Sequence, residues 1–237
     1  ALDGEASAAF RDRLSLDSKR LEQISDSLLQ VAALPDPVGE EVEHKTLSNG
    51  LDVRKIRSPL GVILMIFESR PNVAIEAFSL GFKAGNAMIL RGGKESRQTT
   101  EVLYKLLNDA LALAGVPGEC LWGITDPDRK HVEWLLQQKQ AIDVVVPRGG
   151  DGLIDFVTRT SLIPVIKNDR GLCHVYAHQD ADQEMAQEIV VNAKTQRPGV
   201  CNSMETLLVH ELIAPEFLPK LHGRLSSLGV EWFGCDR

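Results

Sequence analysis

This sequence of 237 residues lacks the features of several protein classes. It has no long apolar run and no signal-like start, so we expect no membrane span and a cytoplasmic location in which thiols stay reduced. Asp and Glu (33) outnumber Lys and Arg (26), and the formal net charge is -7. Because nucleic acids and anionic membranes attract clustered positive charge, neither is an expected partner. These absences favour a role with small molecules.

Cysteine is sparse, and familiar cofactor motifs are missing. The four cysteines form no C-x-x-C pair and match no familiar zinc-ligand spacing, so we predict no metal site. The patterns G-x-G-x-x-G and G-x-x-x-x-G-K-[ST] do not occur, which argues against an ordinary Rossmann fingerprint and against a P-loop.

Short apolar segments alternate with helical patterns over the first two thirds of the chain. GVILMIF (61–67) is a continuous apolar run, typical of a parallel strand that is buried on both faces. We predict strands at 52–59, 61–67, 87–93, 119–123 and 142–146, and helices at 17–33, 73–83, 99–114, after 126–129, and at 153–160. This order predicts an α/β fold with a doubly wound parallel sheet.

Polar or glycine-rich segments follow three of these strands: ESRPN (68–72), RGGKES (91–96) and PRGGDG (147–152). Ligands of such sheets bind at the carboxyl ends of the strands. Glycines let a ligand approach the backbone, cationic side chains pair with phosphate, and a helix N-terminus attracts anions. We predict a nucleotide-phosphate site, although each segment alone is also compatible with a plain turn. The candidate residues are Arg91, Gly92, Lys94, Pro147, Arg148, Gly149 and Gly150.

The pattern changes after residue 162. Residues 161–178 predict two strands around a glycine-containing turn, 181–196 predict a helix, and METLLVH (204–210) predicts a strand. We therefore expect two domains, 1–162 and 163–237, the second being a partial α/β domain.

Cys201 lies in NAKTQRPGVCNSME (192–205), between this helix and the last strand. A structural cysteine usually lies within an apolar run, whereas Cys201 follows Lys194 and Arg197, and nearby cations favour the reactive thiolate. We interpret Cys201 as a candidate nucleophile displayed on a loop. Cys173 and His174 are interpreted instead as part of a buried strand pair.

The segments ESRPNV, GNAMILRGGKES, IDVVVPRGG, CHVY and NAKTQRPGVCNSMETLLVH resemble the gamma-glutamyl phosphate reductase family of the aldehyde dehydrogenase superfamily, from about residue 10 to the end. The resemblance implies an aldehyde dehydrogenase-like fold, with an NADPH-binding domain at 1–162 and a catalytic domain at 163–237. It also implies helices before Ala1, more of the catalytic domain after Arg237, a homo-oligomeric full-length protein, and channelling with glutamate 5-kinase.

The implied reaction is reduction of L-glutamyl 5-phosphate by NADPH to L-glutamate 5-semialdehyde and phosphate, the second step of proline biosynthesis. Cys201 would form a thioester, with its backbone N–H and Asn72 as oxyanion donors. Lys194, Arg197 and Arg70 would bind the substrate. Hydrolytic relatives carry an E-L-G-G type glutamate, and IPVIKNDRGLCHVY has none, which favours reduction. The alternatives are an inactive nucleotide-binding fragment and a family member that reduces another acyl phosphate or thioester.

Overall fold

The computed structural model describes residues 14–68, 70–167, 171–198 and 200–235. The chain divides into two compact units, and the boundary in the sequence lies between residues 168 and 169. The division falls later than the predicted boundary at 162 and 163. Ile163 is buried in the core of the first unit, and Val165 forms a parallel bridge with Val145 of the sheet. Residues 163–167 therefore belong to the first unit.

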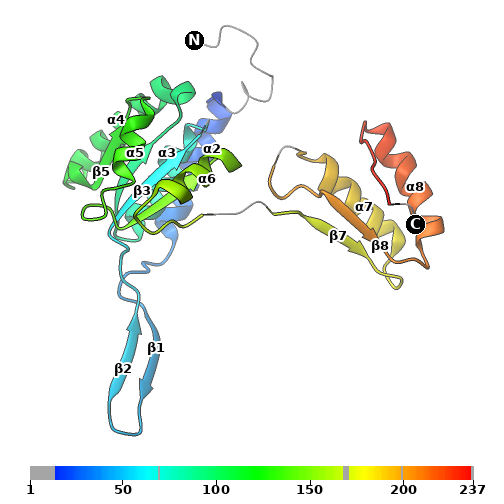
Figure 1. Ribbon diagram of the computed structural model, residues 1–237, viewed down its shortest axis with the longest axis horizontal. Helices are drawn as coiled ribbons and strands as arrows, with labels where there is room; N and C mark the ends of the chain where they lie inside the picture. Colours follow the sequence, from blue (N-terminus) through cyan, green and yellow to red (C-terminus); the bar gives the residue numbers. More distant parts are fainter. Residues whose placement is uncertain (1–13, 69, 168–170, 199, 236–237) are drawn as a thin grey trace. The chain divides into compact units, whose positions relative to one another are not determined.

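The first unit contains a four-stranded parallel sheet in the order β5-β4-β3-β6 (Figure 1). Its strands are β3 (Val62–Phe67), β4 (Ala87–Arg91), β5 (Leu121–Ile124) and β6 (Val144–Arg148). The register places Leu64 beside Ile89 on one side and beside Val145 on the other. The predicted apolar run at 61–67 thus forms an inner strand.

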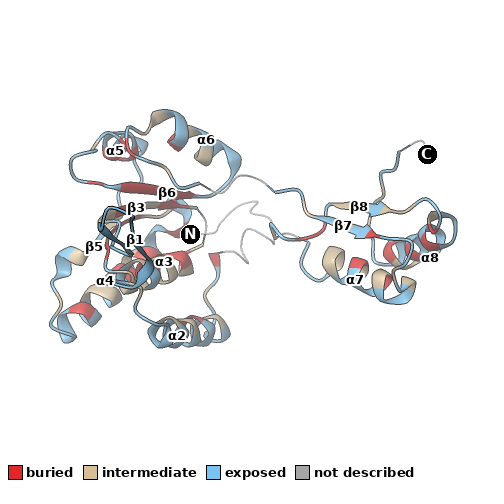
Figure 2. Cartoon of the chain, turned by 90° about the horizontal axis from the view of Figure 1, so that it is seen from below, coloured by how far each residue is buried: buried red, intermediate tan, exposed pale blue. Residues whose placement is uncertain are grey.

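Helices cover both faces of this sheet because its strands are apolar on both faces. Ile63 and Phe67 pack with α3 (Asn72–Lys83) and α4 (Arg97–Leu113). Leu64 and Ile66 pack with α5 (Arg129–Leu135) and α6 (Asp151–Thr160). Buried residues accordingly run along β3 and β6 in Figure 2. The expected doubly wound α/β fold is confirmed.

The strand order contains a switch point between β3 and β6. The chain adds β4 and then β5 on one side of β3, and it returns to place β6 on the other side. The helices that follow β3 and β6, which are α3 and α6, therefore pack on opposite faces of the sheet. This arrangement leaves room for a ligand outside the carboxyl ends of the two strands.

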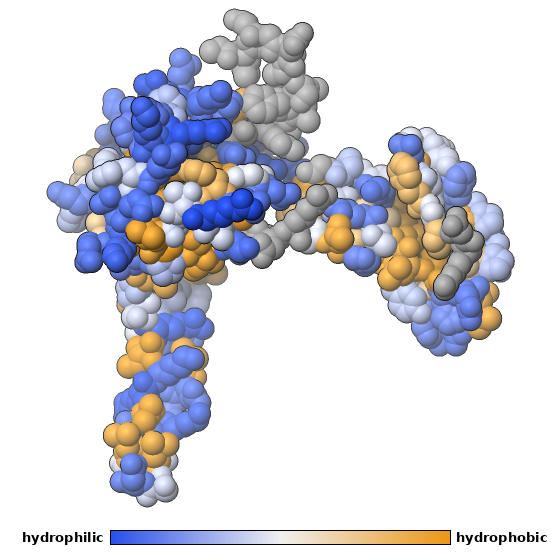
Figure 3. Space-filling view, viewed as in Figure 1, coloured by the Kyte–Doolittle hydropathy of each residue, from blue (hydrophilic) through white to orange (hydrophobic). Residues whose placement is uncertain are grey.

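Two further elements belong to the first unit. Helix α2 (Ser18–Ala33) begins at Asp17, whose carboxylate accepts the Arg20 N–H, and matches the predicted helix at 17–33. An antiparallel hairpin joins β1 (Glu41–Thr46), which the sequence pattern did not reveal, to β2 (Asp52–Ile56). Every residue of the two strands is exposed, and apolar side chains lie along the hairpin in Figure 3.

The second unit is built on two parallel strands, β7 (His174–Ala177) and β8 (Thr206–Val209), with α7 (Gln183–Thr195) and α8 (Ala214–Ser227). Its core is Ala177, Val190, Met204, Ile213, Phe217, Leu221 and Leu225. Of the two strands predicted within 161–178, only β7 forms, and α8 was not predicted. No helix in the described ranges combines the length and apolar character needed to cross a bilayer.

Candidate functional site

The three segments singled out at strand ends lie at one edge of the sheet. Because β3, β4 and β6 are parallel neighbours, the residues after them emerge on the same side. A backbone hydrogen bond, from the Glu68 N–H to the Arg148 carbonyl (3.1 Å), joins the first segment to the third. The structure therefore places residues 68, 70–72, 91–96 and 147–152 at the same edge of the sheet.

A carboxylate that no local pattern predicts there, that of Glu68, lies at the N-terminus of α6. The Gly150 N–H donates to the Glu68 Oε2 (3.0 Å) just before the helix begins. A Cβ at Gly149 would lie 2.7 Å from the same oxygen and 2.8 Å from the Leu153 Cδ2, so a side chain there would displace the ends of Glu68 and Leu153. The helix N-terminus that we expect to attract an anion therefore lies beside a carboxylate of the chain itself. Pro147 and Arg148 lie within β6, the first buried and the second exposed.

Arg91, Gly92 and Lys94 differ in their environments. Arg91 ends β4, and its Nη2 donates to the Pro127 carbonyl (3.0 Å). Burial, followed by repulsion from Arg129, lowers the pKa of Arg91. Gly92 permits close packing, since a Cβ there would lie 3.2 Å from both the Phe67 and the Thr100 side chains. Lys94 is exposed at the start of a short 3-10 helix, so it is the cation of this group that faces solvent.

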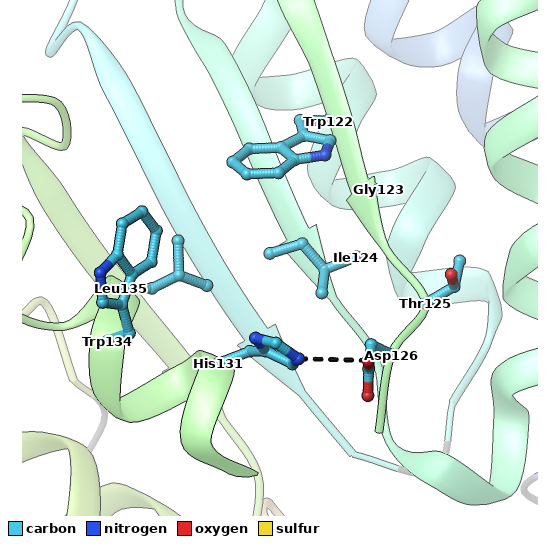
Figure 4. Close-up of a pocket in the computed structure, with 8 residues that line it drawn as sticks. All are labelled: Trp122, Gly123, Ile124, Thr125, Asp126, His131, Trp134 and Leu135. Atoms are coloured by element: carbon cyan, nitrogen blue, oxygen red, sulfur yellow. Dashed lines mark hydrogen bonds and ion pairs between the residues drawn. The ribbon is translucent and has the colours of Figure 1, made fainter. Parts of the chain in front are cut away.

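A pocket of about 290 Å³ lies at the carboxyl end of β5, beside α5 (Figure 4). Two exposed indoles, Trp122 and Trp134, line it together with an ion pair between the His131 Nε2 and the Asp126 Oδ2 (3.1 Å). The Asp128 N–H, and then His131, lower the pKa of Asp126. No local sequence pattern indicates this pocket, because Trp122 lies in β5 and Trp134 lies in α5.

Two other expected site residues lie around the start of α3 in the first unit. Asn72 is the first residue of the helix, and its Nδ2 donates to the Glu76 Oε1 (2.8 Å). Arg70 is half-buried, and its carbonyl accepts the Val73 N–H (3.1 Å). Asn72 and Arg70 are thus in one unit, whereas Cys201, Lys194 and Arg197 are in the other.

Cys201 is exposed in the connection between α7 and β8. The end of this connection is tied to α7, because the Ala193 carbonyl accepts the Met204 N–H (3.0 Å) and the Ser203 hydroxyl (3.3 Å). The Lys194 Nζ donates to the Met204 carbonyl (3.1 Å), so this ammonium fixes the connection that carries Cys201. Arg197 is exposed.

A second cysteine lies beside this connection. The Cys173 Sγ donates to the Cys201 carbonyl at 3.4 Å. Only β7 of the predicted pair forms, and it begins at His174 and pairs with β8. Cys173 is half-buried and His174 is exposed, so the expectation that both lie in a buried strand pair is wrong. Ala177 is the buried residue of β7, and Val175 packs half-buried against the same core, so His174 and Tyr176 are left exposed. Within the described ranges, no group of three or more potential metal ligands occurs.

The first unit contains a parallel sheet with a switch point. The second contains an exposed cysteine that precedes a parallel strand. Residues 17–232 match the model of the aldehyde dehydrogenase family. The chain belongs to the aldehyde dehydrogenase family. Membership in this family implies a nicotinamide cofactor. Lys94 is exposed at the carboxyl edge of the first sheet, where its charge suits a phosphate of such a group, whereas the Gly150 N–H is bound to Glu68.

Individual aldehyde dehydrogenase relatives confirm the resemblance that the motifs predict. Gamma-glutamyl phosphate reductase of Desulforapulum autotrophicum is 49% identical over 235 residues, which are 99% of this chain and 56% of that protein. The crystal structure of gamma-glutamyl phosphate reductase from Thermotoga maritima has a TM-score of 0.92 and 38% identity, covering 98% of this chain and 56% of that one. The chain thus spans about half the length of these relatives.

The fold extends to more distant aldehyde dehydrogenase-like structures. An engineered glycolyl-CoA reductase with bound NADP+ has a TM-score of 0.65 at 20% identity, over 92% of this chain and 55% of that one. At this identity the likeness concerns the fold alone. It agrees with the α/β architecture and parallel sheet described above.

Proposed function

We propose that this chain is the cofactor-binding and nucleophile-bearing part of a reductase that converts L-glutamyl 5-phosphate to L-glutamate 5-semialdehyde and phosphate with NADPH. The observation that carries the proposal is Cys201, an exposed thiol on a connection that hydrogen bonds tie to α7. Relatives named gamma-glutamyl phosphate reductase, 45% to 49% identical over nearly the whole chain, support the choice of substrate. The reaction would be the second step of proline biosynthesis.

Cys201 would act by covalent catalysis. Its thiolate attacks the acyl-phosphate carbonyl carbon, the bond from that carbon to the phosphate oxygen breaks, and a thioester forms as phosphate leaves. NADPH, when bound, supplies the hydride that reduces the thioester. The resulting hemithioacetal breaks its C–S bond, which releases the aldehyde and restores the thiolate.

The tetrahedral oxyanion needs hydrogen-bond donors, and the negatively charged substrate needs cationic side chains to bind it. We assign the Cys201 backbone N–H and the Asn72 amide as oxyanion donors. In the structure the Asn72 amide donates to Glu76, so this assignment requires that amide to change partners. Arg70, Arg197 and Lys194 would bind the phosphate or carboxylate of the substrate. Lys194 would do so while it holds the connection through the Met204 carbonyl.

The first unit would bind the cofactor through the strand ends at its switch point. The positive charges of Arg91 and Lys94 favour the additional phosphate of NADPH over NADH. Both glycines after β6 are exposed and precede α6, where backbone N–H groups favour phosphate. A phosphate there would displace the Glu68 carboxylate from the Gly150 N–H. The assigned residues are Arg91, Gly92, Lys94, Pro147, Arg148, Gly149 and Gly150.

Assembly and cellular context complete the proposal. We expect a cytoplasmic homo-oligomer that channels its substrate from glutamate 5-kinase. Exposed apolar side chains on the hairpin, such as Val53 (44%) and Ile56 (55%), favour contact with another chain.

The test uses the full-length protein that contains this chain. We expect Cys201→Ser to lower the rate of NADPH oxidation with L-glutamyl 5-phosphate by at least about 10³-fold, because the nucleophile is lost. Cys235→Ser, a matched change at another exposed cysteine, should leave the rate unchanged. Comparable activity in the two variants would refute the role of Cys201.

Two outcomes of the same assay favour the alternatives. NADPH binding without turnover of any acyl substrate indicates a catalytically inert nucleotide-binding protein. Turnover of an acyl-CoA thioester, without turnover of the acyl phosphate, indicates a different reductase of the family. A thioester is the appropriate second substrate to test, because an engineered glycolyl-CoA reductase shares the fold.

A further inference from the structure

Cys173 and Cys201 lie close together in the second unit although 28 positions separate them in the chain. The Cys173 Sγ is 3.4 Å from the Cys201 carbonyl oxygen. Within one residue the carbonyl oxygen and the Cα are about 2.4 Å apart, so the Cα of Cys201 lies within about 6 Å of the Cys173 sulfur. A disulfide would require the Cys201 side chain to rotate toward Cys173 and its exposed turn to shift.

Backbone hydrogen bonds hold both cysteines in this neighbourhood. The Cys173 carbonyl accepts the Glu205 N–H (2.9 Å) and the Thr206 N–H (3.1 Å), which fixes Cys173 against the start of β8. The Met204 N–H is bound to the Ala193 carbonyl at the end of α7. The segment containing Cys201 is therefore anchored on both sides, and the closeness of the two thiols follows from the fold of the second unit.

The two thiols differ in exposure. Cys201 is exposed, whereas Cys173 is half-buried and its thiol already donates to the Cys201 backbone. Oxidants react with accessible thiolates, and a neighbouring thiol then resolves the oxidised sulfur. The structure thus provides an accessible cysteine together with a sheltered partner next to it.

We propose that Cys173 and Cys201 form a peroxide-sensitive pair in which Cys173 resolves oxidised Cys201. The Cys201 thiolate attacks the distal oxygen of a hydroperoxide, the O–O bond breaks, and a sulfenic acid forms as hydroxide or alkoxide leaves. The Cys173 thiol then loses its proton and attacks the Cys201 sulfur. The S–O bond breaks, water leaves and a disulfide remains, so the two thiols lose two electrons in total to the peroxide. A reducing dithiol reverses the change by exchange.

The disulfide would shield Cys201 from irreversible oxidation to sulfinic acid while it blocks that thiol. The consequence that the reductase is reversibly switched off rests on the proposed function. Formation of the disulfide does not, because it requires only the two thiols and the fold that brings them together.

The test treats the reduced 237-residue chain with hydrogen peroxide, alkylates the remaining thiols, and maps the cysteines by mass spectrometry without reduction. Trypsin separates the two cysteines, because Lys194 lies between them. We expect a cross-linked peptide pair that contains Cys173 and Cys201 and that disappears on treatment with dithiothreitol. The matched variant is Cys173→Ser, whose hydroxyl can donate to the same carbonyl but cannot form a disulfide. In this variant Cys201 should accumulate as sulfinic acid about tenfold more than in the unmodified sequence.

Three results would overturn the proposal: equal sulfinic acid at Cys201 in both proteins, a Cys201 disulfide mainly with Cys120 or Cys235, or oxidation that spares Cys201. The test is independent of catalysis. A full-length protein that forms the disulfide but fails the reductase assay refutes the proposed function alone, whereas an active enzyme without the disulfide refutes the redox pair alone.

Discussion

The sheets of the two units are buried to different extents. In β3 four of six residues are buried, and helices cover both faces of the strand. In β8 no residue is fully buried, and in β7 only Ala177 is. The comparison shows what each sheet contributes. The first is a core that holds strand ends in place, and the second is a thinner support that displays two thiols near its surface.

The largest expected effect tests this difference in burial directly. Leu64 is fully buried in β3, so Leu64→Ala should lower the free energy of unfolding of the first unit by about 2–5 kcal/mol. Leu208 in β8 is 50% exposed, and Leu208→Ala should cost the second unit under about 1 kcal/mol. Urea denaturation measures both. Trp122 and Trp134 fluorescence reports the first unit in a Trp232→Phe background, and Trp232 reports the second when the other two are Phe. Equal losses would contradict the comparison.

A pair of glycines should respond in opposite directions. A Cβ at Gly123 in β5 would lie 2.2 Å from the Tyr104 ring, which is buried and donates its hydroxyl to the Leu90 carbonyl. Gly123→Ala should therefore destabilise the first unit by about 1–3 kcal/mol through overpacking. Gly223 in α8 is exposed and has open space, so Gly223→Ala should stabilise the second unit by about 0.5–1 kcal/mol. Thermal unfolding distinguishes the two, and a shared sign would show that local space does not decide the outcome.

The smallest expected effect concerns acid. Hydrogen bonds lower the pKa of Asp126 in the first unit below its ordinary 3.8 and that of Glu216 in the second below its ordinary 4.5. A pKa that is lower in the folded state stabilises the fold above the ordinary pKa, and this contribution disappears as the pH falls through the folded-state value. Both carboxylates are fully exposed, so the contribution is small. Acid titration of Asp126→Asn and Glu216→Gln should show slightly less loss of stability below these values than the unmodified sequence, and an unchanged profile would contradict this.

Local patterns predicted most of the first unit and part of the second. Apolar runs identified β3 and β4, and helical spacing identified α2 and α7. The pattern failed where an element depends on a partner. The strand β1 has the polar sequence EVEHKT and forms by pairing with β2. Helix α8 contains Pro219, which argues locally against a helix, but burial of Phe217 and Leu221 stabilises it.

The candidate site divides in the same way. Its segments could be predicted, since glycines and cations after strands, and a cysteine after cations, are local signals. The contacts of its side chains could not. Arg91 reaches a carbonyl 36 positions away, and Glu68 reaches Gly150 across 82 positions.

Local sequence patterns therefore predicted most strands and helices of the first unit, the doubly wound sheet, the family resemblance and the position of Cys201 before a strand. These follow from apolar spacing and from residues adjacent in the chain. Three contacts depend on tertiary folding: Glu68 with the Gly150 N–H, Lys194 with the connection that carries Cys201, and Cys173 with Cys201. The physical reason is that a hydrogen bond requires atoms within about 3.5 Å. Folding brings such atoms together, however far apart they lie along the chain.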